Sequence, residues 1–278
     1  MQYARLWENG TSGLYVFHES QYFAVKNRCG EHIDLPEGMA AGEDLTEWAE
    51  AALQGPPTQK YRFLPAVPPG GKLICVGTNY KKHLAEIKLP VPTSPVLFSK
   101  FDNALAAHGE EIALPACARQ FDHEAELVLV IGKKGKLILR EDALSHVFGF
   151  TCGNDLSARD LQFQTSQWLV GKTADGFAPL GPNIGTIKGL DPDRLGIFLR
   201  VNGETRQKGN TGDMIFSCDE LISYISQTIT LLPGDVVFTG TPEGVIQGLP
   251  ESERVWLKAG DRVEVEIEGL PPLSNTLK

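Results

Sequence analysis

The chain has 278 residues, of which 42% are hydrophobic and 22% are charged, which is typical of a globular protein and excludes a disordered or fibrous chain. The net charge of −9 argues against a nucleic-acid-binding protein, because such a protein needs a basic surface. The five cysteines are scattered, and there is neither a signal peptide nor a run of about 18 apolar residues, so we expect a cytoplasmic protein that binds no membrane.

Residues 1–68 are predicted to form a small N-terminal αβ domain. Residues 14–17 and 22–25 have the composition of short strands, and residues 44–53 have the apolar spacing of one helix. Two clusters rich in proline and glycine then follow, the second ending at Gly71, and they are typical of a linker. We therefore place the boundary to the next domain between residues 68 and 69.

Residues 69–278 are predicted to form a β-rich domain. The expected strands are 73–76, 127–131, 197–201, 236–239 and 262–267. The expected helices are 79–88, 156–164 and 219–228. Because these helices do not alternate regularly with strands, the pattern disfavours a doubly wound parallel sheet and favours an α+β fold built on a β-roll or sandwich.

Two glutamates open a strand that is predicted to be buried. Glu124 and Glu126 lie on the same face of the strand, and beyond Glu126 both faces are apolar. Because bare buried carboxylates are costly, a cation is expected between them. In the C-terminal run 263–268 the glutamates have a similar spacing, but there only the face opposite the glutamates is apolar. This pattern indicates that the glutamate face is solvated. A solvated surface is also the alternative for Glu124 and Glu126.

A third carboxylate, Asp155, ends another β-run where a helix is expected to begin. Its alternative role is that of a helix N-cap, for which aspartate is favoured. Three carboxylates without a nearby thiolate favour a hard cation with oxygen ligands, Mg²⁺ or Mn²⁺, over zinc. The sequence therefore predicts one divalent ion per chain.

His83 and Glu86 are three residues apart in the helix expected at 79–88, so their side chains are neighbours. A carboxylate beside an imidazole fixes its tautomer and raises its basicity, as the activation of water requires. The alternative is a solvated pair without function. The proline-rich stretch 89–95 could act as a hinge, so the helix could be a lid that carries a catalytic base.

Most of residues 72–278 resembles the fumarylacetoacetate hydrolase (FAH) superfamily, in particular its acylpyruvase-like and 2-hydroxyhepta-2,4-diene-1,7-dioate isomerase-like members. The matching segments are in family order, and they are 75–80, 95–100, 123–127, 154–162, 171–172, 181–182, 201–204 and 232–245. The resemblance implies an FAH-type mixed β-roll, a small N-terminal domain and a homodimer. The segment 248–258 looks longer than the usual connection in this family.

The resemblance also implies a role for each candidate site residue. The implied metal ligands for Mg²⁺ or Mn²⁺ are Glu124, Glu126 and Asp155. The implied catalytic residues are His83, Glu86 and Lys172, of which the lysine would meet the enolate or carboxylate of the substrate. The implied substrate-binding residues are Arg159, Gln162 and Thr241.

The expected function is that of a divalent-metal-dependent hydrolase or lyase acting on 2-oxo (β-diketo) acids. C–C bond hydrolysis of an acylpyruvate-type substrate through a metal-bound enolate is the main hypothesis. Alternatives are an oxaloacetate decarboxylase and an isomerase or decarboxylase of 2-hydroxyhepta-2,4-diene-1,7-dioate from aromatic degradation; a non-catalytic binding protein is a remote one. The lining of the pocket for the far end of the substrate would discriminate between these reactions, because basic residues suit a second carboxylate and apolar residues suit acyl chains.

Overall fold

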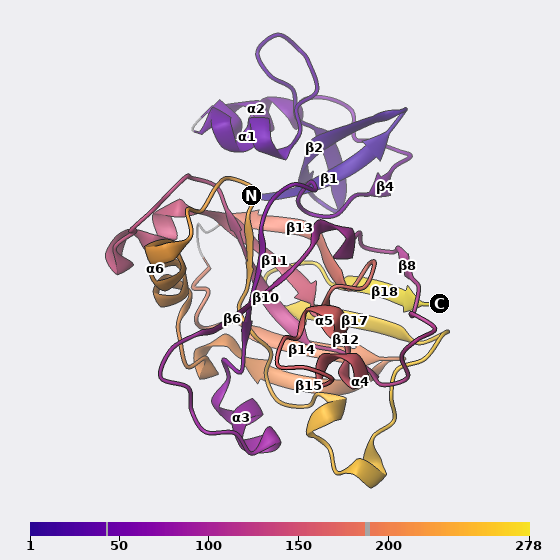
Figure 1. Cartoon of the computed structure of the whole chain (residues 1–278). Helices are drawn as coiled ribbons and strands as arrows, with labels where there is room; N and C mark the ends of the chain where they lie inside the picture. The colour runs from indigo at the N-terminus through magenta and orange to yellow at the C-terminus, as the bar shows by residue number, and fades with distance from the viewer. Residues whose placement is uncertain (43, 187–189) are drawn as a thin grey trace.

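A computed structural model describes residues 1–42, 44–186 and 190–278 of the chain. Strands dominate, and they form an 11-stranded sheet, a 5-stranded sheet and a 2-stranded sheet accompanied by short helices. The expected α+β, β-rich class is thus confirmed (Figure 1). Within the described residues, no helix has both the length and the apolar character needed to cross a membrane.

The N-terminal segment forms three antiparallel strands, β1 (Gln2–Glu8), β2 (Thr11–His18) and β3 (Gln21–Ala24), which accompany helices α1 (Leu35–Ala41) and α2 (Asp44–Ala52). The expected strands and the helix at 44–53 are present, but β1 and α1 were missed. Helix α1 is short and contains Pro36 and Gly38, which hides its period.

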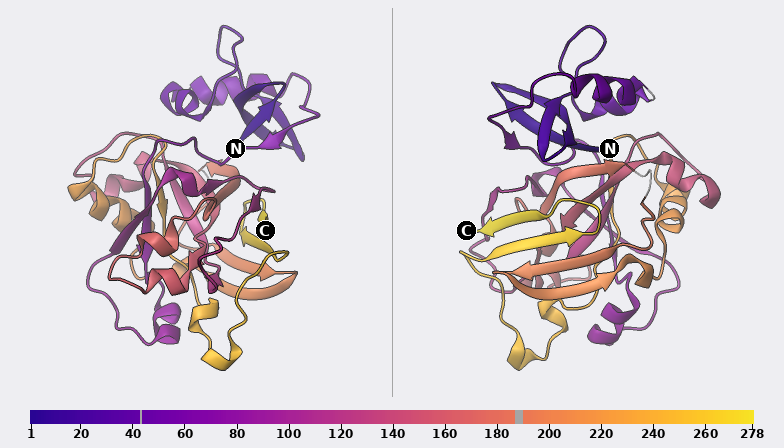
Figure 2. Two further views of the ribbon diagram at one scale, coloured as in Figure 1. Left: turned by 45° about the vertical axis from the view of Figure 1, so that its right-hand side comes forward. Right: turned by 180° about the vertical axis from the view of Figure 1, so that it is seen from behind.

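This unit lies at one end of the molecule, and its sheet continues into the rest of the chain (Figure 2). Strand β1 pairs with β13 (Ala178–Thr186), with Gln2 opposite Gly185. The large sheet therefore runs β3-β2-β1-β13 and on through β11 (Val147–Asn154), β10 (Ala125–Ile131), β16 (Val236–Phe238), β5 (Leu73–Gly77) and β6 (Val96–Lys100). Its two other strands, β4 (Arg62–Phe63) and β7 (Leu105–Ala106), pair with β1 and β13. One cluster of buried side chains joins Leu14 of β2 to Val128 of β10. The domain boundary after residue 68 stays a prediction.

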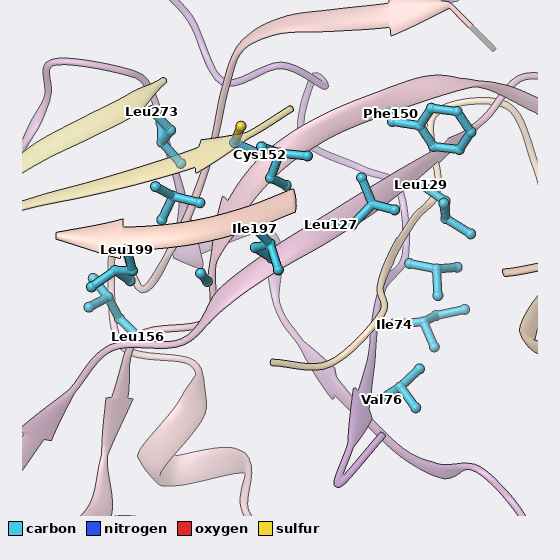
Figure 3. Packing of buried hydrophobic residues seen from close by; sticks show 14 of the residues in the cluster. Ile74, Val76, Leu127, Leu129, Phe150, Cys152, Leu156, Ile197, Leu199 and Leu273 are labelled. Carbon is cyan, nitrogen blue, oxygen red and sulfur yellow. The ribbon is translucent and has the colours of Figure 1, made fainter. Parts of the chain in front are cut away.

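The 5-stranded sheet has the order β15-β14-β17-β18-β8 and packs against the large sheet. Its strands are β8 (Glu111–Ile112), β14 (Gly196–Val201), β15 (Glu204–Asn210), β17 (Arg262–Ile267) and β18 (Leu273–Leu277). Leu127 and Leu129 of β10 share a buried cluster with Ile197 and Leu199 of β14 (Figure 3). This apolar layer fixes where β10 begins, and with it the position of the acidic residues.

The remaining strands, β9 (Phe121–Asp122) and β12 (Ser157–Ala158), form the 2-stranded sheet, and short helices connect the strands. The helices are α3 (Lys81–Ile87), α4 (Arg159–Gln162), α5 (Leu169–Lys172) and α6 (Cys218–Thr228), with 3₁₀ helices η1 (Asp102–Ala104), η2 (Arg140–His146), η3 (Thr211–Asp213), η4 (Ile246–Gly248) and η5 (Glu251–Glu253). The expected strands are all present. The helix expected at 156–164 is wrong over its first residues, where β12 forms instead.

Candidate active site

Three acidic side chains converge where β10 begins and β11 ends. Because β10 and β11 pair antiparallel with Ala125 opposite Asn154, Glu124 and Asp155 become neighbours, and the Asp155 N–H donates to the Glu124 carbonyl at 2.9 Å. One carboxylate oxygen each of Glu124, Glu126 and Asp155 lies within 4.8 Å of the others, and all three residues are buried. The N-cap alternative for Asp155 is wrong, since α4 begins only at Arg159.

Buried cations surround two of these acids. Lys172 Nζ donates to Glu124 Oε2 at 2.7 Å and to Asp155 Oδ2 at 2.8 Å. Arg159 Nη2 donates to Glu124 Oε1 at 2.6 Å, and Lys100 Nζ lies 2.5 Å from Asp155 Oδ1. Burial opposes ionisation of Glu124, but Lys172 and Arg159 outweigh it and hold its pKa well below the usual range.

Glu126 is different, because within the described residues no cation lies within 4.0 Å of its carboxylate. Its Oε2 accepts only the backbone N–H of Gly240, at 2.7 Å. Burial, with the charges of Asp155 and Glu124, raises the pKa of Glu126 well above its usual value. The site therefore holds a buried carboxylate without a positive partner among three hard oxygen donors, and this donor set fits Mg²⁺ or Mn²⁺.

His83 and Glu86 face one another on α3. His83 Nδ1 lies 3.3 Å from Glu86 Oε2, and Glu86 Oε1 accepts the Gly244 backbone N–H at 3.0 Å. His83 is only 6% exposed, so the alternative of a solvated pair is wrong. A Cβ at residue 248 would lie 2.2 Å from Glu86 Cδ, so only glycine leaves room for this carboxylate.

A cavity of about 570 Å³ joins these two groups. Of the nine residues expected in the site, Asp155 alone is absent from its lining. The other eight are His83, Glu86, Glu124, Glu126, Arg159, Gln162, Lys172 and Thr241. Asp155 is completely buried behind them. The rest of the wall is mixed, because apolar and aromatic residues such as Phe98, Phe163 and Trp168 line it together with Lys88 and Arg254.

Two of the expected substrate-binding residues already have partners. Gln162 Oε1 accepts from Arg159 Nη1 at 2.9 Å, which orients the guanidinium. The Thr241 hydroxyl donates to the Ala125 carbonyl at 2.9 Å and accepts from Gln207 Nε2 at 2.8 Å. The Thr241 side chain thus holds the start of β10 in place as well as lining the cavity.

Sequence reasoning missed Asp122, Lys100 and Gln207. The fully buried Asp122 carboxylate accepts the backbone N–H groups of Ile246 and Gln247, at 2.8 and 2.9 Å, and lies 2.9 Å from Arg159 Nε. The signal that could have found Lys100 is a charged residue at the end of an apolar strand. For Asp122 and Gln207 the sequence offers no such signal.

The sequence model described as the C-terminal domain of fumarylacetoacetate (FAA) hydrolase matches residues 72–278. The chain belongs to the fumarylacetoacetate hydrolase superfamily. The resemblance deduced from the sequence is therefore confirmed. The chain is an enzyme of this superfamily, since similar proteins carry the names of enzymes.

Three similar proteins are informative. Human "oxaloacetate tautomerase FAHD2A, mitochondrial" is 46% identical over 244 residues, which are 87% of this chain and 77% of the relative. A fumarylacetoacetate hydrolase from psychrophilic Exiguobacterium antarcticum superposes with a TM-score of 0.87 at 33% identity, over 100% of this chain and 99% of the other. Fumarylpyruvate hydrolase from Pseudomonas aeruginosa, solved in complex with Mn²⁺ and pyruvate, superposes with a TM-score of 0.68 at 34% identity. This match covers 79% of this chain and 92% of the other.

The human relative's name places that protein in mitochondria. The cytoplasmic location expected for this chain is therefore not supported by its relatives, and it stays a prediction. The homodimer, the small-molecule substrate and the absence of a nucleic-acid or membrane partner also stay predictions.

Proposed function

We propose that this enzyme transfers a proton on a 2-oxo acid with the help of a divalent metal ion, and that its reaction is the keto–enol tautomerisation of oxaloacetate. The observation that carries the proposal is one cavity lined both by carboxylates of the acidic cluster and by the His83–Glu86 pair. The name of the human relative supports oxaloacetate as the substrate. The sequence-based hypothesis placed C–C bond hydrolysis first, and that reaction is the second candidate below.

Glu124, Glu126 and Asp155 would hold Mg²⁺ or Mn²⁺, which supplies Lewis acidity to the 2-oxo group when bound. Glu86 faces Nδ1 of His83, so Nε2 is the ring nitrogen left to accept a proton. His83 removes a proton from the carbon beside the oxo group, which leaves an enolate. The same imidazolium returns the proton to the enolate oxygen and gives the enol.

The cations around Glu124 stabilise the negative charge that develops on the substrate in this reaction. Arg159 and Lys172 line the cavity, and each is nearly completely buried. Fixed positive charges in a site that excludes water stabilise an enolate more than solvent does. We assign Lys172 to the enolate or carboxylate of the substrate, with Arg159 and Gln162 beside it.

Hydrolytic cleavage of a C–C bond in an acylpyruvate is the second candidate. The cavity of about 570 Å³ is larger than a four-carbon acid requires, and Phe98, Phe163 and Trp168 offer apolar surface to an acyl chain. In this reaction His83 would take a proton from water as the water attacks the distal carbonyl. The structural similarity to fumarylpyruvate hydrolase supports this candidate. Decarboxylation and isomerisation would use the same residues.

One set of assays separates these reactions. The decay of enol absorbance measures oxaloacetate tautomerisation, and the release of pyruvate and CO₂ from oxaloacetate and from an acylpyruvate series measures cleavage and decarboxylation. His83→Ala at the same metal concentration is the control, because free metal ions also act on oxaloacetate. We expect His83→Ala to lower the enzymatic rate by roughly 10²- to 10⁴-fold. Full activity after exhaustive chelation would contradict the metal requirement, and no turnover of any oxo acid would favour a non-catalytic protein.

A further inference from the structure

Two basic side chains of the cavity wall lie apart from the acidic cluster. Lys88 follows α3 directly, and Arg254 follows η5. Both belong to segments at the periphery of the molecule, where α3 and the yellow segment before β17 lie at the same end (Figure 1). Lys88 is exposed and Arg254 is partly exposed, whereas the acids are buried. The two cations are therefore at the solvent side of the cavity.

The deeper cations are already matched to carboxylates. Arg159 pairs with Asp122 and Glu124, and Lys172 pairs with Glu124 and Asp155. Both cations also serve the 2-oxo acid end of the substrate in the proposed function, so moving one of them to a remote group would break a buried ion pair and leave a protein charge unpaired. A second carboxylate on the substrate therefore needs another cation.

Arg254 is free to supply that charge. Its Nε donates to the Leu249 carbonyl at 2.8 Å, and this is the one hydrogen bond that the guanidinium forms within residues 1–42, 44–186 and 190–278. In the same part of the chain no carboxylate oxygen lies within 4.0 Å of it. The bond to Leu249 fixes the plane of the guanidinium and leaves both Nη groups available. A planar fork of this kind matches a carboxylate with two parallel hydrogen bonds, which the ammonium of Lys88 cannot do.

We infer that Arg254 is a specificity-determining residue that binds the distal carboxylate of a dicarboxylic 2-oxo acid. The inference rests on the proposed function, because it takes the 2-oxo acid end of the substrate to lie at the acidic cluster. Apolar wall residues such as Phe98 and Trp168 then face the carbon chain between the two carboxylates. The enzyme thereby prefers diacids to monoacids of equal length.

Length-matched binding probes test this assignment without turnover. Calorimetry of the Mn²⁺-loaded protein compares 2-oxoglutarate with 2-oxovalerate, and 2-oxoadipate with 2-oxohexanoate. The wild type is expected to prefer the diacid in at least one pair, and Arg254→Gln is expected to reduce that diacid-to-monoacid affinity ratio by roughly 10- to 100-fold. Arg254→Lys should restore part of it, because it keeps the charge and loses the fork. Arg140→Gln, an exposed arginine outside the cavity lining, is the matched control.

The outcomes separate this inference from the proposed function. If the wild type prefers diacids and the Arg254→Gln variant keeps the full preference, the assignment is overturned. It is also overturned if Lys88→Gln, and not Arg254→Gln, loses the preference for diacids. A wild type that binds all four acids without preference would also overturn it. If the Mn²⁺-loaded wild type binds none of the oxo acids and turns over none, the proposed function itself fails.

Discussion

Asp122 and Arg159 form a buried ion pair in which Asp122 Oδ2 lies 2.9 Å from Arg159 Nε. The same carboxylate accepts the backbone N–H groups of Ile246 and Gln247 in η4. Arg159 in turn reaches Glu124, so one aspartate links the segment beside Glu86 to the acidic cluster. Asp122 acts as a positioning residue for both halves of the cavity.

Asp122→Asn is expected to destabilise the protein by roughly 1–3 kcal/mol, because it removes one of the two carboxylates that compensate the buried charge of Arg159, the other being Glu124. Urea unfolding measures the change. Asp44→Asn, which removes the exposed ion pair with Arg28, is the matched control and should cost no more than about 1 kcal/mol. Equal costs for the two variants would mean that burial of the Asp122 pair contributes nothing.

Glu126→Gln is expected to abolish Mn²⁺ binding and, at the same time, to stabilise the metal-free protein. The reason is that Glu126 is a buried carboxylate without a cationic partner in the described residues, so its charge is costly until a metal ion compensates for it. Calorimetric titration with Mn²⁺ and thermal unfolding without metal measure the two effects. Glu264→Gln is the control, since this strand glutamate is partly exposed and pairs with Arg262. Undiminished Mn²⁺ binding by Glu126→Gln would disprove its role as a ligand.

Gly248→Ala is expected to lower kcat by roughly 10- to 100-fold with little loss of thermal stability. The added Cβ would overlap the Glu86 carboxylate, so that this side chain must leave the Gly244 N–H and its position beside His83. Steady-state kinetics and a thermal melt separate the two effects. Gly13→Ala, whose new Cβ meets only ordinary contacts, should change neither quantity. An unchanged kcat in Gly248→Ala would show that the placement of Glu86 does not matter.

The Arg5–Asp34 ion pair should make stability dependent on acid pH. Arg5 Nε and Nη2 each donate to the Asp34 carboxylate at 2.7 Å. Burial of Asp34 opposes its ionisation, but Arg5 and the Leu35 N–H outweigh it and lower the pKa of Asp34 below its usual value. A lowered pKa in the folded state means that the pair stabilises fully above the unfolded value of about 3.9, and that this contribution is lost as the pH falls through the folded value.

The measurement is the difference in free energy of unfolding between pH 6 and pH 3 for the wild type and for Asp34→Asn. The variant should be less stable at pH 6, where it lacks the ion pair with Arg5, and the gap should narrow at pH 3. Asn at this position still offers an oxygen to cap α1, so the comparison isolates the charge. A gap that stays constant with pH would contradict the assignment.

The acidic cluster could be predicted because its signal is local. Glu124 and Glu126 stand at the mouth of a strand that is apolar on both faces, whereas Glu264 lies on a strand with one apolar face only. The first pair is buried and the second glutamate is partly exposed, so the apolar continuation after Glu126 distinguished the two cases. His83 and Glu86 are likewise neighbours by helical spacing alone.

The partners of Asp122 and Lys100 could not be predicted in this way. Asp122 holds Ile246, which is 124 positions away in the sequence. Lys100 donates to the carbonyl groups of Leu156 and Phe177, which only the pairing of the sheets brings together. Contacts of this kind depend on tertiary register, and a single sequence carries no record of it. Strand β1 was missed for a similar reason. It is stabilised by the strands on both sides, β2 and β13, and β13 is far away in the sequence.

The pairing of β1 with β13 has a consequence for any shortened form of the enzyme. Residues 1–68 cover part of the outer edge of β13 through Gln2 and Tyr3, and Ala66 donates its N–H to the Leu180 carbonyl. A chain that starts at residue 69 would present these backbone groups as an open edge, and open edges recruit strands from other molecules. The N-terminal segment thus shields a backbone edge of residues 69–278 against pairing with strands of other molecules.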